Sequence, residues 1–161
     1  MNKNDIHVLS RGVIIKQDHI FLAYDPRPHP NHYYELNTKF YYLPGGHIDF
    51  QESAQNALVR EIEEETGFTS KIEKFLGVIE HVRNFVGDDV RCHTHEVNLI
   101  FKVDIVELNC GDMVPQKEEH VAFKWIAIDQ LEAFDLRPLP LKTSLLRWLE
   151  CTDSNTFQST I

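Results

Sequence analysis

The chain has 161 residues, 42% of them hydrophobic and 25% charged, a composition typical of a globular protein large enough for a full core. Its 25 acidic residues outnumber its 16 Lys and Arg residues, so the formal net charge is −9 at pH 7. This balance argues against a surface built for nucleic acid or for an anionic membrane, because no basic excess is present to neutralise phosphates. A polyphosphate ligand would need metal ions to mask its charge.

The start of the chain and its cysteines indicate the cellular setting. Residues 1–5 lack the apolar region of a signal peptide, and no run reaches the ~18 apolar residues of a membrane span. Cys92, Cys110 and Cys151 are odd in number and lack metal-ligand spacing, which predicts reduced thiols. We therefore expect a cytoplasmic protein.

The N-terminal part of the chain predicts a β-hairpin. Residues 7–16 and 19–24 are expected to form strands, joined by a turn at Gln17 and Asp18. Residues 25–37, which contain three prolines, are expected to form a loop. Long ordered loops are often functional, so this one is a candidate for substrate selection.

A short aromatic strand, residues 40–43, leads into Pro44, Gly45 and Gly46. Proline fixes its own backbone and paired glycines accept unusual conformations, so the strand should end there. The aromatic side chains before this turn could stack on a base, with packing in the loop and strand as the alternative. They are Tyr33, Tyr34, Tyr41 and Tyr42.

The next segment predicts a helix that begins near Ser53, a good N-cap residue, and ends at Gly67, which suits a left-handed C-cap. On a helical wheel, one arc of roughly 140° collects its apolar residues. They are Ala54, Ala57, Leu58 and Ile62.

Some glutamates of this predicted helix lie within the apolar arc. Glu61 and Glu65 lie inside it and Glu64 lies at its edge, whereas Glu63 points the opposite way. The spacing i, i+3, i+4 brings Glu61, Glu64 and Glu65 together, and an unpaired charge is costly to bury. A hard divalent cation with oxygen ligands would offset their repulsion. The alternative is an acidic helix whose glutamates pair with lysines elsewhere.

The C-terminal half predicts a second hairpin and an ending of strand and helices. The hairpin strands are residues 74–85 and 96–106, with the turn at 87–89. A polar loop, 109–119, leads to a strand, 120–128, and to a short helix capped by Asp129. A last helix over residues 141–150 should place three leucines on one side, Leu145, Leu146 and Leu149.

This order of elements predicts an α/β fold with a mixed sheet between helices. We expect one domain over residues 1–161, with a polar, frayed tail from about residue 153.

The glycine turn and the acidic helix together carry a specific pattern. The pattern resembles the Nudix box of the Nudix (MutT-like) hydrolase family, and its fixed positions are Gly46, Glu52, Arg60, Glu61, Ile62, Glu64, Glu65, Gly67 and Phe68. Residues 119–126 and 129–131 also resemble that family's strand-and-helix ending, so the resemblance reaches from about residue 7 to residue 149. It implies the α/β/α Nudix sandwich, in which the box forms a loop-helix-loop.

The resemblance also implies a site chemistry: hydrolysis of a nucleoside diphosphate linked to another group, with Mg²⁺ or Mn²⁺. The implied metal ligands are the carbonyl of Gly45 and the carboxylates of Glu61, Glu64, Glu65 and Glu119. The implied catalytic residues are Glu61, Glu64 and Arg60, where Arg60 is expected to hold a box glutamate. Which carboxylate acts as general base stays open. Glu52 and Gly67 are expected to be structural.

Glu119 is preferred to Glu118 on strand alternation. Val121, Phe123 and Trp125 share one face, and Glu119 joins them if the alternation extends back one step. The expected substrate-binding residues are Tyr33, Tyr34, Tyr41 and Gly46. The histidines, including His47, His81, His93, His95 and His120, are interpreted as core or surface residues.

The sequence lacks the features that mark two substrate subgroups of the family that it resembles. The ADP-ribose subgroup carries a proline beyond the box, but residues 69–113 contain none. The diadenosine polyphosphate subgroup carries a tyrosine at a similar distance, but no tyrosine follows Tyr42. The sequence therefore favours a (d)NTP or modified dNTP, cleaved to the monophosphate and pyrophosphate. The runner-up is a sugar-nucleotide or other nucleotide-diphosphate pyrophosphatase.

Two other classes remain as alternatives. An RNA 5′-end hydrolase should show a basic track, which the acidic balance disfavours. A catalytically silent Nudix-like binding module should have lost box carboxylates, and all are present. We expect a small nucleotide as partner, with no membrane and no nucleic acid, and leave a homodimer open.

Overall fold

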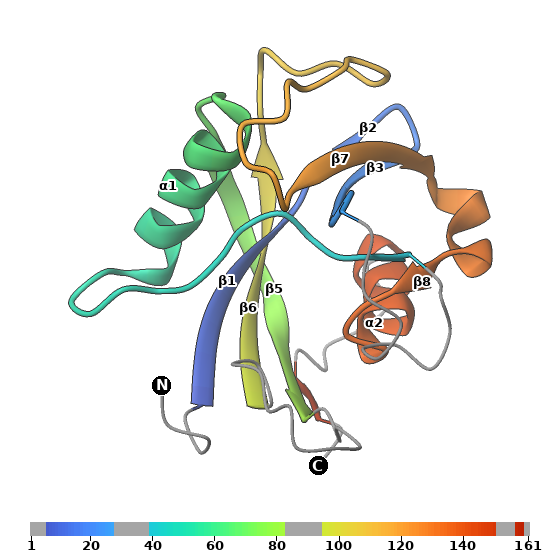
Figure 1. The fold of residues 1–161 in the computed structure, drawn as a ribbon. Helices are drawn as coiled ribbons and strands as arrows, with labels where there is room; N and C mark the ends of the chain where they lie inside the picture. Colours follow the sequence, from blue (N-terminus) through green and yellow to red (C-terminus); the bar gives the residue numbers. More distant parts are fainter. Residues whose placement is uncertain (1–5, 28–38, 83–94, 151–156, 160–161) are drawn as a thin grey trace.

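The computed structural model describes residues 6–27, 39–82, 95–150 and 157–159. Its long central sheet has the strand order β1-β6-β5-β9 (Figure 1). β1 (Ile6–Val13) is parallel to β6 (His95–Asp104), which is antiparallel to β5 (Lys71–Val82). β9 (Phe157–Ser159) adds a short parallel strand beside β5. The sheet is therefore mixed, as the sequence predicts.

A second sheet has the order β2-β3-β7 and contains the predicted N-terminal hairpin. β2 (Ile15–Lys16) is antiparallel to β3 (His19–Tyr24), and β3 is antiparallel to β7 (Ala122–Ala127). Gln17 and Asp18 turn the chain with φ of 48° and 59°, so the hairpin is confirmed. Its first strand is interrupted, because β1 ends before β2 begins and pairs with β6 instead.

Two further strands of two residues join the middle of the chain to its C-terminal part. β4 (Phe40–Tyr41) pairs in parallel with β8 (Asp135–Leu136). This pairing fixes the entry of the chain into the glycine turn.

Helices cover both sides of the central sheet (Figure 1). α1 (Ala54–Thr66) buries Leu58 and Ile62 in one apolar cluster with Phe101 of β6. α2 (Pro140–Leu149) packs in a second cluster, which includes Ile100 of β6. Neighbouring residues of a strand point to opposite faces, so the two clusters fill the two sides of the sheet. The expected layered α/β architecture is confirmed.

The structure corrects several predicted details near the C-terminus. The short helix is the 3-10 helix η1 (Ile128–Ala133), and Asp129 lies in its first turn rather than capping it. α2 buries Leu141, Leu145 and Trp148, while Leu146 is half-buried, so the predicted leucine side is rotated. The tail is not simply frayed, because β9 pairs with β5.

Some predictions fall outside the described residues. They are the turn at 87–89, His93, Cys92, Cys151, and most of the loop over residues 25–37. Cys110 is described and has a free thiol. Within the described part, no helix is both long and apolar enough to cross a membrane.

Candidate active site

Both predicted caps of α1 are present. Ser53 has extended backbone angles (φ −77°, ψ 150°), and its Oγ accepts a hydrogen bond from Asn56 N at 3.2 Å. Gly67 is left-handed at φ 82°, and its N–H donates to the Glu63 carbonyl at 2.8 Å. The caps fix the length of the helix and hence which side chains share each turn.

The rotation of α1 separates its glutamates as the wheel predicts. Glu65 is buried, with 6% exposure, and Glu61 is half-buried. Glu64 and Glu63 are exposed. The carboxylates of this helix thus run from the protein interior to the surface.

The glycine turn lies tightly against β1. Ser10 N donates to the Gly46 carbonyl and Gly12 N donates to the Pro44 carbonyl, both at 2.9 Å. Gly45 has φ 116°, and a Cβ there would overlap the Ser10 carbonyl oxygen. A Cβ on Gly46 would overlap the carboxyl group of Glu61. Glycine is required at position 45 by the positive φ and the close β1 backbone, and at position 46 by the adjacent carboxylate.

Glu65 closes this arrangement from the helix side. Its Oε2 accepts a hydrogen bond from Gly45 N at 3.2 Å. Burial raises the pKa of Glu65 to about 7, and Glu61 and Glu118 act in the same direction, whereas Arg11 and the Gly45 N–H oppose the shift. A buried carboxylate beside two others is the kind of group that a divalent cation stabilises.

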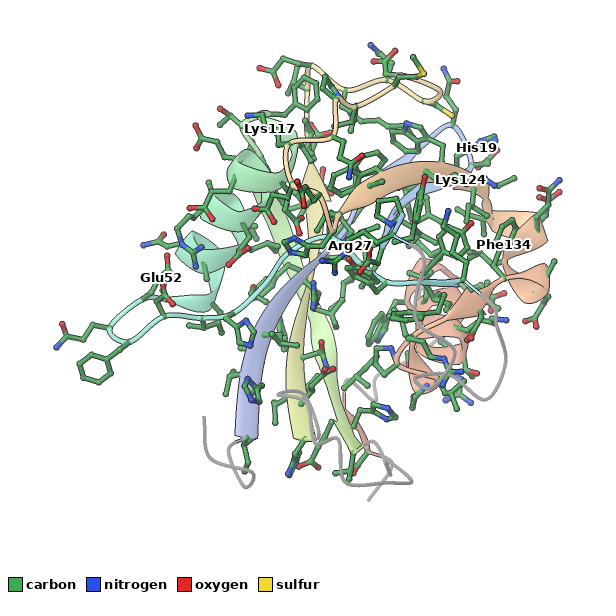
Figure 2. The ribbon with its side chains drawn as sticks, viewed as in Figure 1. His19, Arg27, Glu52, Lys117, Lys124 and Phe134 are labelled. Atoms are coloured by element: carbon green, nitrogen blue, oxygen red, sulfur yellow. The ribbon has the colours of Figure 1, made fainter. Side chains whose placement is uncertain are left out.

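Arg60 holds the exposed end of the carboxylate set. Its guanidinium binds Glu52 with two hydrogen bonds, from Nε at 3.0 Å and from Nη2 at 2.9 Å. Nη1 also donates to Glu61 at 2.8 Å and to Glu64 at 3.2 Å. The hydrogen bonds to Glu52 are the largest cause of the raised pKa of Arg60. Arg60 thus contacts the box glutamates and links Glu52 to the helix. Glu52 lies beside α1 (Figure 2).

A cavity of about 330 Å³ opens beside these groups, close to the lower size of small-ligand sites. The glycine turn and α1 contribute Gly45, Gly46, Glu61 and Glu65 to its lining. β1 and β6 contribute Arg11, Glu96, Asn98 and Ile100, and other segments add Tyr42, Glu118 and Arg137. The cavity combines carboxylates at one wall with cationic and aromatic groups, which suits a charged ligand with an aromatic ring.

The donor set fits a hard divalent ion, since it consists of carboxylate and carbonyl oxygens. Within the described residues, however, no three Asp, Glu, His or Cys side chains converge on one point as they stand. Glu61 and Glu64 are bonded to Arg60, and Glu65 is bonded to Gly45 N. A metal ion would have to draw these side chains together.

Comparison with known families identifies the pattern. The NUDIX domain matches residues 6–149. The chain belongs to the Nudix family.

Relatives with curated names differ in what they act on. The chain is 35% identical over 78 residues to an ADP-ribose pyrophosphatase of Methanocaldococcus jannaschii, which covers 47% of this chain and 43% of the relative. It is 27% identical over 138 residues to the NAD-capped RNA hydrolase NudC of Pseudomonas aeruginosa, which covers 85% of this chain and 40% of the relative. The chain spans between 40% and 53% of the length of the curated relatives it matches.

Solved structures confirm the Nudix fold. A NUDIX hydrolase from Nitrosomonas europaea superposes with a TM-score of 0.67 at 20% identity, covering 92% of this chain and 91% of the other. A MutT NUDIX hydrolase from Burkholderia pseudomallei gives a TM-score of 0.58 at 25% identity, covering 91% and 98%.

The preference for Glu119 over Glu118 rests on an alternation that the structure does not contain. β7 begins at Ala122, and the preceding residues form a turn in which Val121 N donates to the Glu118 carbonyl at 3.3 Å. Glu118 is half-buried and lines the cavity beside the Nudix box, whereas Glu119 is exposed. The turn reverses which of the two glutamates faces the box.

The loop that carries Glu118 lies beside the C-terminal end of the Nudix helix. The Lys117 ammonium lies where a side chain on Gly67 would be, beside the C-terminal end of α1 (Figure 2). A cation at a helix C-terminus is favourable, because the last carbonyls carry partial negative charge. This contact brings the neighbouring Glu118 close enough to affect the pKa of Glu65.

Of the predicted substrate-binding residues, Gly46 lines the cavity and Tyr41 does not. Tyr41 is buried between Tyr24 and Phe134, with ring centroids 5.6 and 5.4 Å away. Tyr42 lines the cavity instead, and burial raises its pKa to about 12. Tyr33 and Tyr34 lie outside the described residues.

Three polar residues that the central sheet contributes to the cavity are absent from the residues predicted for the site. They are Arg11 on β1, and Glu96 and Asn98 on β6. In β6 the apolar residues Val97, Leu99 and Phe101 alternate with Glu96 and Asn98, which are buried on the face of Ile100. The period of two residues that places Glu96 and Asn98 on the same face as Ile100 is the sequence pattern that could have indicated them.

Proposed function

We propose that the protein is a metal-dependent pyrophosphohydrolase that cleaves a phosphoanhydride bond of a nucleoside diphosphate derivative. The observation that carries this proposal is the set of oxygen donors at the cavity, made by the Gly45 carbonyl and the carboxylates of Glu61 and Glu65, with the exposed Glu64 held beside Glu61 by Arg60. Such a set matches Mg²⁺ or Mn²⁺, which when bound neutralises phosphoryl oxygens and lowers the pKa of water.

The residues of this chain would do the remaining work. Arg60 keeps Glu61 and Glu64 oriented, and Glu52 keeps Arg60 in place through its bidentate pair. The glycine turn lets substrate approach the backbone at Gly46, where any side chain would collide with Glu61. The general base is one of the box carboxylates or Glu118, and of these Glu61, Glu65 and Glu118 line the cavity.

We favour a (d)NTP or modified dNTP as substrate, released as the monophosphate and pyrophosphate. The 30% identity, over 92 residues, to a putative 8-oxo-dGTP diphosphatase of Bacillus subtilis supports this choice. A nucleotide-diphosphate pyrophosphatase is the second candidate, which the likeness to an ADP-ribose pyrophosphatase supports. The net charge of −9 disfavours a long RNA substrate, despite the likeness to an NAD-capped RNA hydrolase.

A nucleotide panel tests the proposal. Canonical dNTPs, 8-oxo-dGTP, ADP-ribose, a sugar nucleotide and an NAD-capped oligoribonucleotide would each be incubated with Mg²⁺ or Mn²⁺, and the products resolved by chromatography. We expect turnover of at least one small nucleotide and its loss in EDTA. The Glu64→Gln variant controls for contaminating phosphatases. Turnover that survives EDTA, or none on the whole panel, would refute the proposal.

A further inference from the structure

Arg11 has an unusual position in this site. It lies on β1, is half-buried, and lines the cavity together with Glu61 and Glu65. Its Nη1 donates to the Leu43 carbonyl at 3.2 Å and also to the Gly45 carbonyl. The guanidinium carbon is 5.5 Å from the centre of the Tyr42 ring. The arginine thus lies against the glycine turn, with its guanidinium at the turn's carbonyls.

The contact with Gly45 conflicts with metal binding at the same oxygen. A carbonyl oxygen can accept a hydrogen bond and bind a cation at once, but the two cations would then be held within a few ångströms of each other. Like charges at that separation repel strongly in a partly buried site. The guanidinium and a divalent ion therefore weaken each other's binding at this carbonyl.

Arg11 also differs from the other arginines beside the box. Arg60 is bonded to three carboxylates, and Arg137 is bonded to Asp135 by Nε at 2.7 Å and Nη2 at 3.0 Å. In the described part of the chain, the hydrogen bonds of Arg11 go to main-chain carbonyls, and its Nε and Nη2 make none. A guanidinium with spare donors at a cavity wall is suited to bidentate binding of phosphate oxygens.

We propose that Arg11 competes with the metal ion for the Gly45 carbonyl, and that metal binding releases its guanidinium to bind the diphosphate of the substrate. The part of this inference that concerns the substrate diphosphate rests on the proposed function. Arg11 is then a switch between two partners: it neutralises the carboxylate wall while bonded to Gly45, and it contacts the phosphates after release. Metal and substrate binding become linked, because the ion frees a ligand for the nucleotide.

The test uses two ligands and no turnover. Arg11→Met keeps most of the side-chain length without the charge, so it removes the competitor and the phosphate donor together. Mn²⁺ binding is measured from the EPR signal of the free ion, and binding of methylene bisphosphonate, a non-hydrolysable diphosphate, is measured by calorimetry at saturating Mn²⁺. We expect about fivefold tighter Mn²⁺ binding, as for loss of one competing hydrogen bond, and about tenfold or more weaker bisphosphonate binding.

The proposal predicts that Arg11→Met tightens Mn²⁺ binding and weakens bisphosphonate binding. A merely structural role of Arg11 would instead weaken the binding of both ligands. Lys16→Met, which removes a cation that pairs with Asp104 outside the cavity, is the control and should leave the Mn²⁺ affinity unchanged. Arg11→Lys, which keeps the charge without the fork, should shift both affinities in the same directions by less, and it replaces the methionine variant if that one does not fold. Unchanged or weaker Mn²⁺ binding overturns the competition. Unchanged bisphosphonate binding, or none by the wild type, overturns the phosphate role. If Arg11→Met binds Mn²⁺ more tightly than the wild type, but the wild type hydrolyses no nucleotide, only the proposed function is refuted.

Discussion

Just before α1, Glu52 is held by two hydrogen bonds from Arg60, whereas near the end of the helix Glu65 is buried and accepts one from Gly45 N. The hydrogen bonds to Arg60 lower the pKa of the Glu52 carboxyl, and burial raises that of Glu65 to about 7. The first group is a scaffold whose charge is already compensated. The second has a charge that Arg11 and the Gly45 N–H compensate only in part, so it is the one that a metal ion would stabilise.

The largest expected effect comes from changing the buried member. Glu65→Gln should lower turnover by roughly 10²- to 10³-fold, as for loss of one group that stabilises transition-state charge. The fold should be retained, because the change removes a buried repelling charge. Steady-state kinetics and circular dichroism measure both. Glu63→Gln, exposed on the same helix, is the control, and equal damage from it would contradict the assigned rotation of α1.

Burial of Glu65 also predicts how stability depends on pH. Its pKa rises from 4.5 in the unfolded chain to about 7 in the folded protein, so the folded state binds the proton more tightly between these values. Stability should therefore fall as pH rises from about 4.5 to 7, by up to about 3 kcal/mol from this group. Urea unfolding in EDTA at pH 5 and pH 8 measures the change.

Two comparisons sharpen that experiment. The Glu65→Gln variant should lack this part of the pH dependence, and Mg²⁺ added to the wild type at pH 8 should restore the lost stability. A pH dependence identical in variant and wild type would show that Glu65 titrates normally.

A smaller effect is expected at the paired member. Glu52→Gln should reduce kcat/KM about 10- to 100-fold, as for loss of a group that orients a metal ligand, since Arg60 would keep Glu61 and Glu64 but lose its own support. The midpoint for Mn²⁺ activation should rise in parallel. If Glu52→Gln were as damaging as Glu65→Gln, the distinction between Glu52 as a scaffold and Glu65 as a carboxylate for the metal ion would be wrong.

The smallest effect concerns the loop glutamates. Glu118→Gln should raise the metal concentration needed for activity a few-fold, because it removes a nearby charge from the wall of the cavity. Glu119→Gln should leave it unchanged. Activity titrated against Mg²⁺ measures both, and a sensitive Glu119 would restore the alternation that the turn rules out.

Local rules were sufficient for the Nudix helix. Ser53 and Gly67 mark its ends, and the 3.6-residue period then places Glu65 inside and Glu63 outside. The hairpin at Gln17 and Asp18 likewise follows from neighbouring residues. Each of these features depends on contacts within a few residues along the chain.

Features set by distant contacts could not be predicted in this way. Arg11 faces the glycine turn because β1 runs parallel to β6, with Arg11 opposite Ile100, and no local pattern announces that register. Glu118 lines the cavity and Glu119 is exposed because a turn precedes β7. Tyr41 and Tyr42 exchange roles because rings from β3 and from the segment after η1 enclose Tyr41.

The short strand β9 gives the central sheet a protected border. It pairs with Val78, Ile79 and Glu80 of β5, and Ser159 Oγ donates to Glu80 at 3.1 Å. Cutting the chain after Glu150 would leave those backbone groups open to pairing with another molecule, which is how unprotected edges lead to aggregation. A shortened protein would therefore fail first in solubility, with its catalytic groups intact, and an inactive preparation of that kind would say nothing about chemistry.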